Sequence, residues 1–257
     1  MTAAARAAVG VFDSGVGGVS ALRDMARLMP GERFLYYGDN RNAPYGTRPE
    51  REILNLALDA ADFLVQKGVK ALVVACNTAT SAAIVALRGR YDMPVVGMEP
   101  ALKPAALLRD RGKVLVLATP ATLRQEKFHH LYELYGEGAE VLPCPGLMEF
   151  AERGELGGPA LDQALESLLS PYRGQRLDAA VLGCTHYVFL RRAIGRTLPG
   201  VPLIDGNAGT AHRLHALLTQ GGLLSNAREG SVTFLTSGDE NVYIPMMKRL
   251  FSLPIED

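Results

Sequence analysis

The feature that most constrains the fold of this chain is a regular alternation of short apolar runs with longer segments of helical periodicity. One such segment has apolar residues at Ile53, Ala57, Ala60 and Leu64, the spacing of one helix face. The apolar runs are continuous, which is typical of strands buried on both faces of a parallel sheet. The expected strands are Ala8–Phe12, Arg33–Tyr37, Ala71–Ala75, Pro94–Gly97, Lys113–Ala118, Glu140–Pro143, Ala179–Gly183, Pro202–Ile204 and Ser231–Thr236.

Two of these strand ends resemble each other. The segments Lys70–Thr78 and Asp178–His186 each contain an apolar run, a small residue, a cysteine and polar residues that open a helix. The two cysteines, Cys76 and Cys184, are 108 positions apart (184 minus 76), a plausible domain length. The repeat is short enough to arise by chance. It nevertheless favours an α/β fold of two similar parallel-sheet domains that face each other across an active-site cleft.

The domain boundaries follow from where the chain can cross between two such sheets. Gly97–Pro104 and Ile204–Thr210 are the best crossing points. We therefore expect residues 1–97 plus 210–257 to form an N-terminal-type α/β domain that carries Cys76, and residues 98–209 to form a second α/β domain that carries Cys184. Ser231–Asp257 reads as a strand and then a helix that return to the first domain. The residues before Ala8 are expected to be a short disordered tail.

Composition excludes several classes of function. The chain has 27 basic and 27 acidic residues, so it lacks the basic excess typical of nucleic-acid binders. No apolar run approaches the length of a membrane span, and the N-terminus lacks the apolar core of a secretory signal. Three sparse cysteines favour free thiols in a reducing compartment over a disulfide framework. We expect a cytoplasmic enzyme with neither a nucleic-acid partner nor a membrane segment.

The two strand-end cysteines suggest acid–base chemistry at carbon. Ligands of open parallel sheets bind beyond the carboxyl ends of the strands, where both cysteines are expected. A thiol that loses its proton near working pH serves as a general base, and a second thiol on the opposite face returns a proton. Inversion of a carbon that bears hydrogen needs this two-sided arrangement. The alternative is inert packing, which remains our interpretation for Cys144 between two prolines.

Other polar residues near the strand ends admit two interpretations each. Asp13 either accepts a proton from a thiol or caps the following helix. His186 either assists Cys184 or is satisfied by the backbone at a helix start. Glu152, from its spacing alone, is most easily a solvated helix residue. The glycines that follow Asp13 allow close backbone approach and offer N–H groups to an anion, but they do not form a nucleotide motif.

The sequence gives no support for a cofactor or a metal. No lysine has a recognisable Schiff-base setting, so a pyridoxal cofactor is not expected. No cysteine or histidine spacing is typical of a metal site. Direct acid–base chemistry remains.

The chain resembles the glutamate racemases, of the aspartate/glutamate racemase superfamily, along almost its whole length. The motifs that carry this resemblance are VFDSGVGG at 11–18, YYGD at 36–39, APYG at 43–46, VVACNTAT at 73–80, VVGMEPALKPA at 95–105, LATPAT at 117–122, VLGCTHY at 181–187 and TSGD at 236–239. The resemblance implies cofactor-independent interconversion of L- and D-glutamate, D-glutamate supply for peptidoglycan, and a homodimer.

The resemblance also assigns roles to individual residues. Cys76 matches the base that acts on D-glutamate, and Cys184 matches the base that acts on L-glutamate. Asp13 matches the carboxylate that assists Cys76, while Glu152 and His186 match the pair that assists Cys184. The residues that match substrate contacts are Asp13, Ser14, Pro44, Tyr45, Gly46, Asn77, Thr78, Thr119, Thr122, Thr185 and His186.

Three alternatives stay open from the sequence. An aspartate or hydantoin racemase would share the two cysteines, although the DSGVGG and PYG motifs favour glutamate. A non-catalytic protein with the same cleft would bind an anion without turnover, and the two retained cysteines argue against it. A regulatory protein–protein role has no support from the neutral charge.

Overall fold

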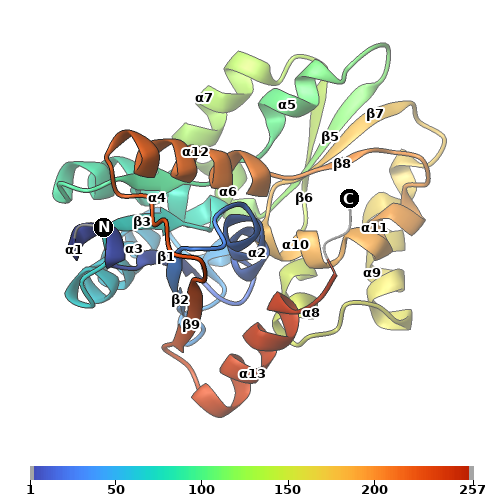
Figure 1. Cartoon of the computed structure of the whole chain (residues 1–257). Coiled ribbons are helices and arrows are strands. Elements are labelled where there is room, and N and C mark those ends of the chain that lie inside the picture. Colours follow the sequence, from blue (N-terminus) through green and yellow to red (C-terminus); the bar gives the residue numbers. More distant parts are fainter. Residues whose placement is uncertain (1–2, 255–257) are drawn as a thin grey trace.

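The computed structural model describes residues 3–254. The chain folds into two parallel β-sheets with helices packed against them (Figure 1). The five-stranded sheet has the order β4-β3-β1-β2-β9, and the four-stranded sheet has the order β6-β5-β7-β8. The first sheet contains β1 (Val9–Asp13), β2 (Arg33–Gly38), β3 (Ala71–Val74), β4 (Val95–Gly97) and β9 (Ser231–Thr236). The second contains β5 (Lys113–Ala118), β6 (Ala139–Pro143), β7 (Leu177–Leu182) and β8 (Leu203–Ile204). The predicted fold class is confirmed, and every predicted strand forms within two residues of its expected bounds.

Helices connect these strands and cover both faces of each sheet. Those packed with the first sheet are α2 (Val19–Leu28), α3 (Glu50–Gln66), α4 (Asn77–Arg90), α12 (Asn207–Gln220) and α13 (Glu240–Phe251). Those of the second sheet are α5 (Leu102–Leu107), α6 (Pro120–Arg124), α7 (Glu126–Tyr135), α8 (Leu147–Glu152), α9 (Pro159–Leu169), α10 (Thr185–Phe189) and α11 (Arg191–Thr197). Two short 3-10 helices, η1 (Tyr45–Thr47) and η2 (Ser170–Tyr172), lie in loops.

Alternate residues of each central strand supply two different cores. In β1, Val9 and Val11 pack with α2, α12 and α13, whereas Phe12 packs with α3 and α4. Successive side chains of a strand point to opposite faces, so a strand covered on both sides must be apolar at every position. This explains why the strands read as continuous apolar runs. The second sheet repeats the pattern, with Leu115 on one face and Val116 on the other.

The two ends of the chain meet on the first sheet. β9 pairs with β2 in parallel, and α13 packs against the same core (Figure 1). The predicted return of the C-terminal strand and helix is therefore confirmed for residues 231–254, and residues 255–257 lie outside the described part. Sheet membership agrees with the proposed domain division, whose boundaries stay a prediction. We call the elements of the five-stranded sheet the first half and those of the four-stranded sheet the second half.

The prediction of a disordered N-terminal tail is wrong for the residues that can be described. Residues Ala3–Arg6 form a short helix, α1, and Ala5 is buried. The Lys70 ammonium donates to the Ala5 carbonyl at 2.8 Å and forms a buried ion pair with Glu32 at 2.8 Å. This contact orders the segment, and local composition did not reveal it. The first two residues are outside the description. No helix within residues 3–254 is long and apolar enough to cross a membrane.

Candidate active site

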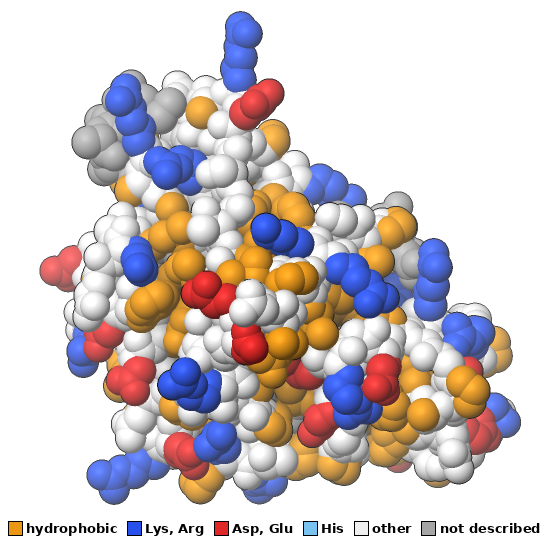
Figure 2. All heavy atoms as spheres, turned by 90° about the horizontal axis from the view of Figure 1, so that it is seen from below, with side chains coloured by type: hydrophobic (Ala, Val, Ile, Leu, Met, Phe, Trp, Pro, Cys, Tyr) orange, Lys and Arg blue, Asp and Glu red, His pale blue; other side chains and the backbone are white. Residues whose placement is uncertain are grey.

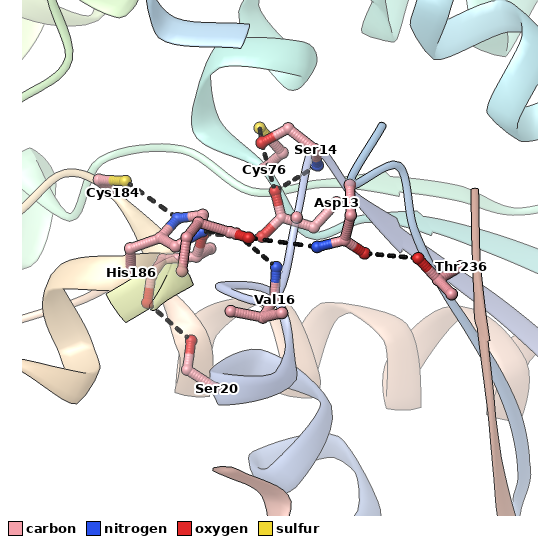
Figure 3. A network of polar contacts seen from close by, with 12 residues as sticks. Asp13, Ser14, Val16, Ser20, Cys76, Cys184, His186 and Thr236 are labelled. Carbon is pink, nitrogen blue, oxygen red and sulfur yellow. Dashed lines mark hydrogen bonds and ion pairs between the residues drawn. The ribbon is translucent and has the colours of Figure 1, made fainter. Parts of the chain in front are cut away.

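Both sequence-predicted cysteines lie where a strand ends and a helix begins. Cys76 follows β3 and occupies the N-cap of α4, and Cys184 follows β7 and occupies the N-cap of α10. Each sheet therefore places one thiol at the carboxyl end of a central strand. Both residues are buried, with 5% and 7% of their surface exposed. Figure 3 shows the two thiols in one polar network with Asp13 and His186.

The Cys76 thiol contacts a hydroxyl that in turn contacts a carboxylate. Its Sγ donates to Ser14 Oγ at 3.8 Å, and the Ser14 hydroxyl donates to Asp13 Oδ1 at 3.1 Å. The sulfur also accepts the Ala79 N–H in the first turn of α4, at 3.4 Å. Burial, and then the negative charge of Asp13, raise the pKa of the Cys76 thiol well above its ordinary value. Cys76 is thus held as a thiol in this closed arrangement.

The Cys184 thiol contacts an imidazole that in turn contacts a carboxylate. Its Sγ lies 3.6 Å from His186 Nδ1, and His186 Nε2 lies 2.6 Å from Glu152 Oε1. Burial alone would lower the pKa of His186, but the hydrogen bonds to Cys184 and Glu152 outweigh burial and raise it well above its ordinary value. Burial would likewise raise the pKa of Glu152, and the hydrogen bond from His186 holds it below its ordinary value instead. The interpretation of His186 as a backbone-satisfied helix-start residue is therefore wrong.

Asp13 joins the two halves. Its Oδ1 accepts the Ser14 N–H at 2.5 Å, and its Oδ2 accepts the Thr185 hydroxyl of the second half at 2.9 Å. The following helix, α2, begins at Val19 with Gly18 as its N-cap. The helix-capping interpretation of Asp13 is therefore wrong, and its carboxylate lies between residues that neighbour the two cysteines.

The glycines after Asp13 make room for side chains of the second half. A Cβ on Gly15 would lie 1.8 Å from Glu152 Oε1, and one on Gly17 would lie 2.3 Å from His186 Nδ1. Between them, the Val16 N–H donates to Glu152 Oε1 at 2.7 Å. The loop does present an N–H group to an anion, as predicted, and that anion is the chain's own Glu152. The interpretation of Glu152 as a solvated helix residue is wrong, because only 14% of its side chain is exposed.

Three threonine hydroxyls meet where the halves adjoin. Thr78 of the first half lies 3.0 Å from Thr119 and 2.9 Å from Thr122, measured between Oγ1 atoms, and the latter two are 2.9 Å apart. All three are buried. With no charged partner among these contacts, the hydroxyls form a neutral cluster of donors beside the Cys76 helix.

The remaining residues that match substrate contacts differ in their freedom to bind. Tyr45 donates its hydroxyl to Asp39 Oδ2 at 2.6 Å, so the predicted donor is already engaged. Asn77 is buried, and its Oδ1 has no hydrogen-bond partner among the described residues. Pro44 precedes η1 and is half-buried, and the Cα of Gly46 faces Thr119, where a Cβ would lie 3.0 Å from Thr119 Cβ.

Sequence reasoning missed Asn40, which contacts Glu152, and Thr236, which contacts Asn40. The Asn40 amide donates to Glu152 Oε2 at 3.2 Å, and the Thr236 hydroxyl donates to Asn40 Oδ1 at 2.8 Å. The only sequence signal was position, since Asn40 follows the YYGD motif and Thr236 opens TSGD. Cys144 lies in the apolar core of the second half, where burial raises its pKa to about 12. This placement agrees with its interpretation as a packing residue.

No group of three or more His, Cys, Asp or Glu side chains suited to a metal ion occurs in the described chain. On the face shown in Figure 2, basic and acidic side chains are interspersed among apolar ones. This distribution agrees with the zero formal charge of the sequence.

Comparison with known proteins agrees with this geometry. The Asp/Glu/Hydantoin racemase family model matches residues 10–214, and the chain belongs to that family. A glutamate racemase of Clostridium botulinum (strain Okra / Type B1) is 45% identical and aligns over 95% of this chain and 97% of its own length. Within the family the chain groups with the glutamate racemases, and it is an amino-acid racemase, an isomerase.

Two solved structures extend the similarity to three dimensions. Glutamate racemase from Thermus thermophilus, in complex with β-chloro-D-alanine, is 38% identical with a TM-score of 0.83, covering 98% of this chain and 95% of that one. Escherichia coli glutamate racemase, in complex with L-glutamate and the activator UDP-MurNAc-Ala, is 33% identical with a TM-score of 0.84, covering 95% of each chain.

Proposed function

We propose that this racemase interconverts L- and D-glutamate by a two-thiol mechanism without a cofactor. The observation that carries the proposal is that each half contributes one strand-end cysteine, and each cysteine has its own route to a carboxylate. In the L-to-D direction, the Cys184 thiolate removes the α-proton, and the Cys76 thiol delivers its proton to the opposite face of the carbanion. In the D-to-L direction the roles of the two thiols reverse.

The supporting residues have distinct tasks in this mechanism. His186, oriented by Glu152, takes up or returns the Cys184 proton, and Asp13 does the same for Cys76 through the Ser14 hydroxyl. Asn77 Oδ1 accepts from the substrate ammonium, because this oxygen is buried and lacks a partner. Thr78, Thr119, Thr122 and Thr185 donate to the carboxylates, and the loop of Pro44, Tyr45 and Gly46 closes the site beside them.

Substrate entry requires the two halves to separate. Both thiols are almost enclosed, and polar contacts cross between the halves at Thr185, the residue after Cys184. The Thr185 hydroxyl donates to Asp13, and the Ser20 hydroxyl donates to the Thr185 carbonyl at 3.2 Å. These two contacts are polar, so glutamate can replace them with its own charged groups. Closure then excludes water from the reacting carbon.

A substrate assay tests the function. Purified protein is incubated with L-glutamate and, in parallel, with L-aspartate, and both enantiomers are quantified by chiral chromatography. We expect glutamate to racemise to an equal mixture and aspartate to react far more slowly. Faster turnover of aspartate would contradict the substrate assignment, and bound but unreacted glutamate would favour the binding-protein alternative.

We also propose that the D-glutamate supplies peptidoglycan synthesis in the cytoplasm and that the chain forms a homodimer. The family membership supports both. Complementation of a bacterial strain that requires external D-glutamate tests the first, and light scattering of the purified protein tests the second. Failure to complement, or a monomeric mass across micromolar concentrations, would contradict the respective proposal.

A further inference from the structure

Asn40 occupies a buried position between the catalytic network and the edge of the first sheet. It lies just beyond the carboxyl end of β2 and is 6% exposed. Its amide joins Thr236, at the end of β9, to Glu152, at the end of α8. The dashed contacts in Figure 3 run from Thr236 toward His186 and Cys184. The thiol is thus connected to an element far from it in the sequence.

In the hydrogen bonds that join Thr236, Asn40 and Glu152, each residue donates to the next. Glu152 Oε1 already accepts from Val16 N–H, and the carboxylate can only accept, so the Asn40 NH₂ group must face Oε2. The amide oxygen then faces Thr236, whose hydroxyl donates to it while accepting the Gly238 N–H at 3.0 Å. A flipped amide would place two acceptors against each other. Each group therefore fixes the orientation of the next.

This directionality determines which ring nitrogen of His186 carries a proton. A carboxylate that accepts at both oxygens stays ionised and requires a donor at His186 Nε2, 2.6 Å from Oε1. His186 Nδ1 is then the atom that faces the Cys184 sulfur and exchanges a proton with it. Without the Asn40 contact, Oε2 would be unpaired, and only the two contacts at Oε1 would hold the carboxylate in place.

We propose that Asn40, itself oriented by Thr236, is a positioning residue that holds Glu152 so that His186 keeps its Nε2–H form and serves Cys184 alone. This inference deepens the proposed two-thiol function and rests on it. Asn40 touches none of the reacting atoms. Its effect is confined to one of the two proton transfers, because Cys76 uses Ser14 and Asp13 instead.

Three variants separate this role from a general effect on folding. Asn40→Leu removes both hydrogen bonds, Thr236→Val removes the hydroxyl that orients the amide, and Thr236→Ser restores that hydroxyl. Asn55→Leu, at an exposed position of α3, is the matched control for an asparagine-to-leucine change. Thermal unfolding of each variant establishes that the folded protein is being compared.

The first readout is the state of the His186 ring in the free protein, observed by ¹⁵N NMR and assigned with His186→Gln. Because the pKa of His186 is raised, the spectra are recorded at alkaline pH, where the ring is neutral. There we expect wild type, Thr236→Ser and Asn55→Leu to keep Nε2 protonated, whereas Asn40→Leu and Thr236→Val show a mixture of tautomers. This measurement needs no turnover. It therefore tests the inference even if glutamate proves not to be the substrate, a result that would defeat the proposed function by itself.

The second readout is the primary deuterium isotope effect in each direction. The two enantiomers have equal free energy, so Asn40→Leu must lower kcat/KM equally in both directions, by about 10- to 100-fold for one lost hydrogen bond to a charged group. Because only the Cys184 step is slowed, the isotope effect should rise for α-deuterated L-glutamate and fall for α-deuterated D-glutamate. Wild-type values of the ring state and of both isotope effects in Asn40→Leu would overturn the inference.

Discussion

Each thiol of this racemase is connected to a carboxylate by one other residue, and this connecting residue differs between the two sides. Cys76 contacts Ser14, which contacts Asp13, whereas Cys184 contacts His186, which contacts Glu152. A hydroxyl passes a hydrogen bond along without holding charge, but an imidazole accepts a full proton near neutral pH. Two strand–cysteine–helix units that look alike in the sequence are therefore equipped with different acid–base chemistry.

The two units have in common that each depends on a contact from the other half of the molecule. Asp13, on the Cys76 side, accepts the Thr185 hydroxyl from the second half. Glu152, on the Cys184 side, accepts the Val16 N–H from the first half. The carboxylate on each side therefore accepts a hydrogen bond from the other half. The separation of the halves that we propose for substrate entry would therefore disturb both sides together.

The largest expected effect comes from removing either sulfur. Cys76→Ala and Cys184→Ala should each lower racemisation by at least about 10³-fold, because general acid–base catalysis contributes about 10² to 10⁴ per group and inversion needs both. Glutamate should still bind, as measured by calorimetry. Cys144→Ala, a buried cysteine outside the network, is the control and should stay active. Wild-type turnover in either catalytic variant would show that the two sides are not both required.

Replacing the two connecting residues, His186 and Ser14, compares the two sides directly. His186→Gln should reduce kcat by about 10²-fold because it removes a group that holds the proton, whereas Ser14→Ala should reduce it by about tenfold because it removes one hydrogen bond. Steady-state kinetics with both enantiomers measures each loss. Equal reductions in kcat would mean that the hydroxyl and the imidazole contribute equally to catalysis.

Crowding the Cys184 side should be nearly as damaging as removing His186. In Gly17→Ala the added carbon would lie 2.3 Å from His186 Nδ1, so the ring must move away from the thiol. We expect kcat/KM to fall by about 10²-fold, the scale of a displacement near 1 Å. Gly209→Ala is the matched control, since its Cβ would meet nothing within 4 Å. Full activity of Gly17→Ala would contradict the close approach of the two halves.

The smallest expected effect is on stability and its pH dependence. Glu152→Gln breaks a buried pair and should lower the free energy of unfolding by about 3 kcal/mol. The lowered pKa of Glu152 adds stability that is present above its ordinary value of 4.5 and lost as pH falls through the folded value. The raised pKa of His186 adds stability that is present below its ordinary value of 6.5 and lost as pH rises through the folded value.

The difference between wild type and Glu152→Gln should therefore be largest between about pH 4.5 and 6.5, with denaturant unfolding as the measurement. A difference that does not change with pH would show that the pair is not ionised in the folded protein.

The sequence predicted the parts of the molecule that depend on local pattern. Continuous apolar runs predicted the parallel strands, because a strand covered on both faces needs apolar side chains throughout. The matched strand ends predicted where Cys76 and Cys184 lie. The family resemblance, rather than spacing, pointed to Glu152, because a helix residue reads as solvated unless its distant partners are known.

The parts that escaped prediction depend on contacts between distant segments. Val16 and Glu152 are 136 positions apart, and Asn40 and Thr236 are 196 apart. No local periodicity encodes such pairs. The order of residues 3–6 likewise depends on Lys70, which donates to the carbonyls of Ala5 and Leu223, 65 and 153 positions away. The contact of Tyr45 with substrate stays a prediction, and the sequence did not reveal the hydrogen bond from its hydroxyl to Asp39.

Proton exchange in heavy water tests the central claim most directly. In a single early turnover of unlabelled L-glutamate in D₂O, two bases on opposite faces should give D-glutamate that carries deuterium at the α-carbon, while the remaining L-glutamate keeps its protium. Mass spectrometry of the separated enantiomers measures the deuterium content of each. Product that retains the original protium, or deuterium appearing equally in both enantiomers from the start, would mean that one base serves both faces.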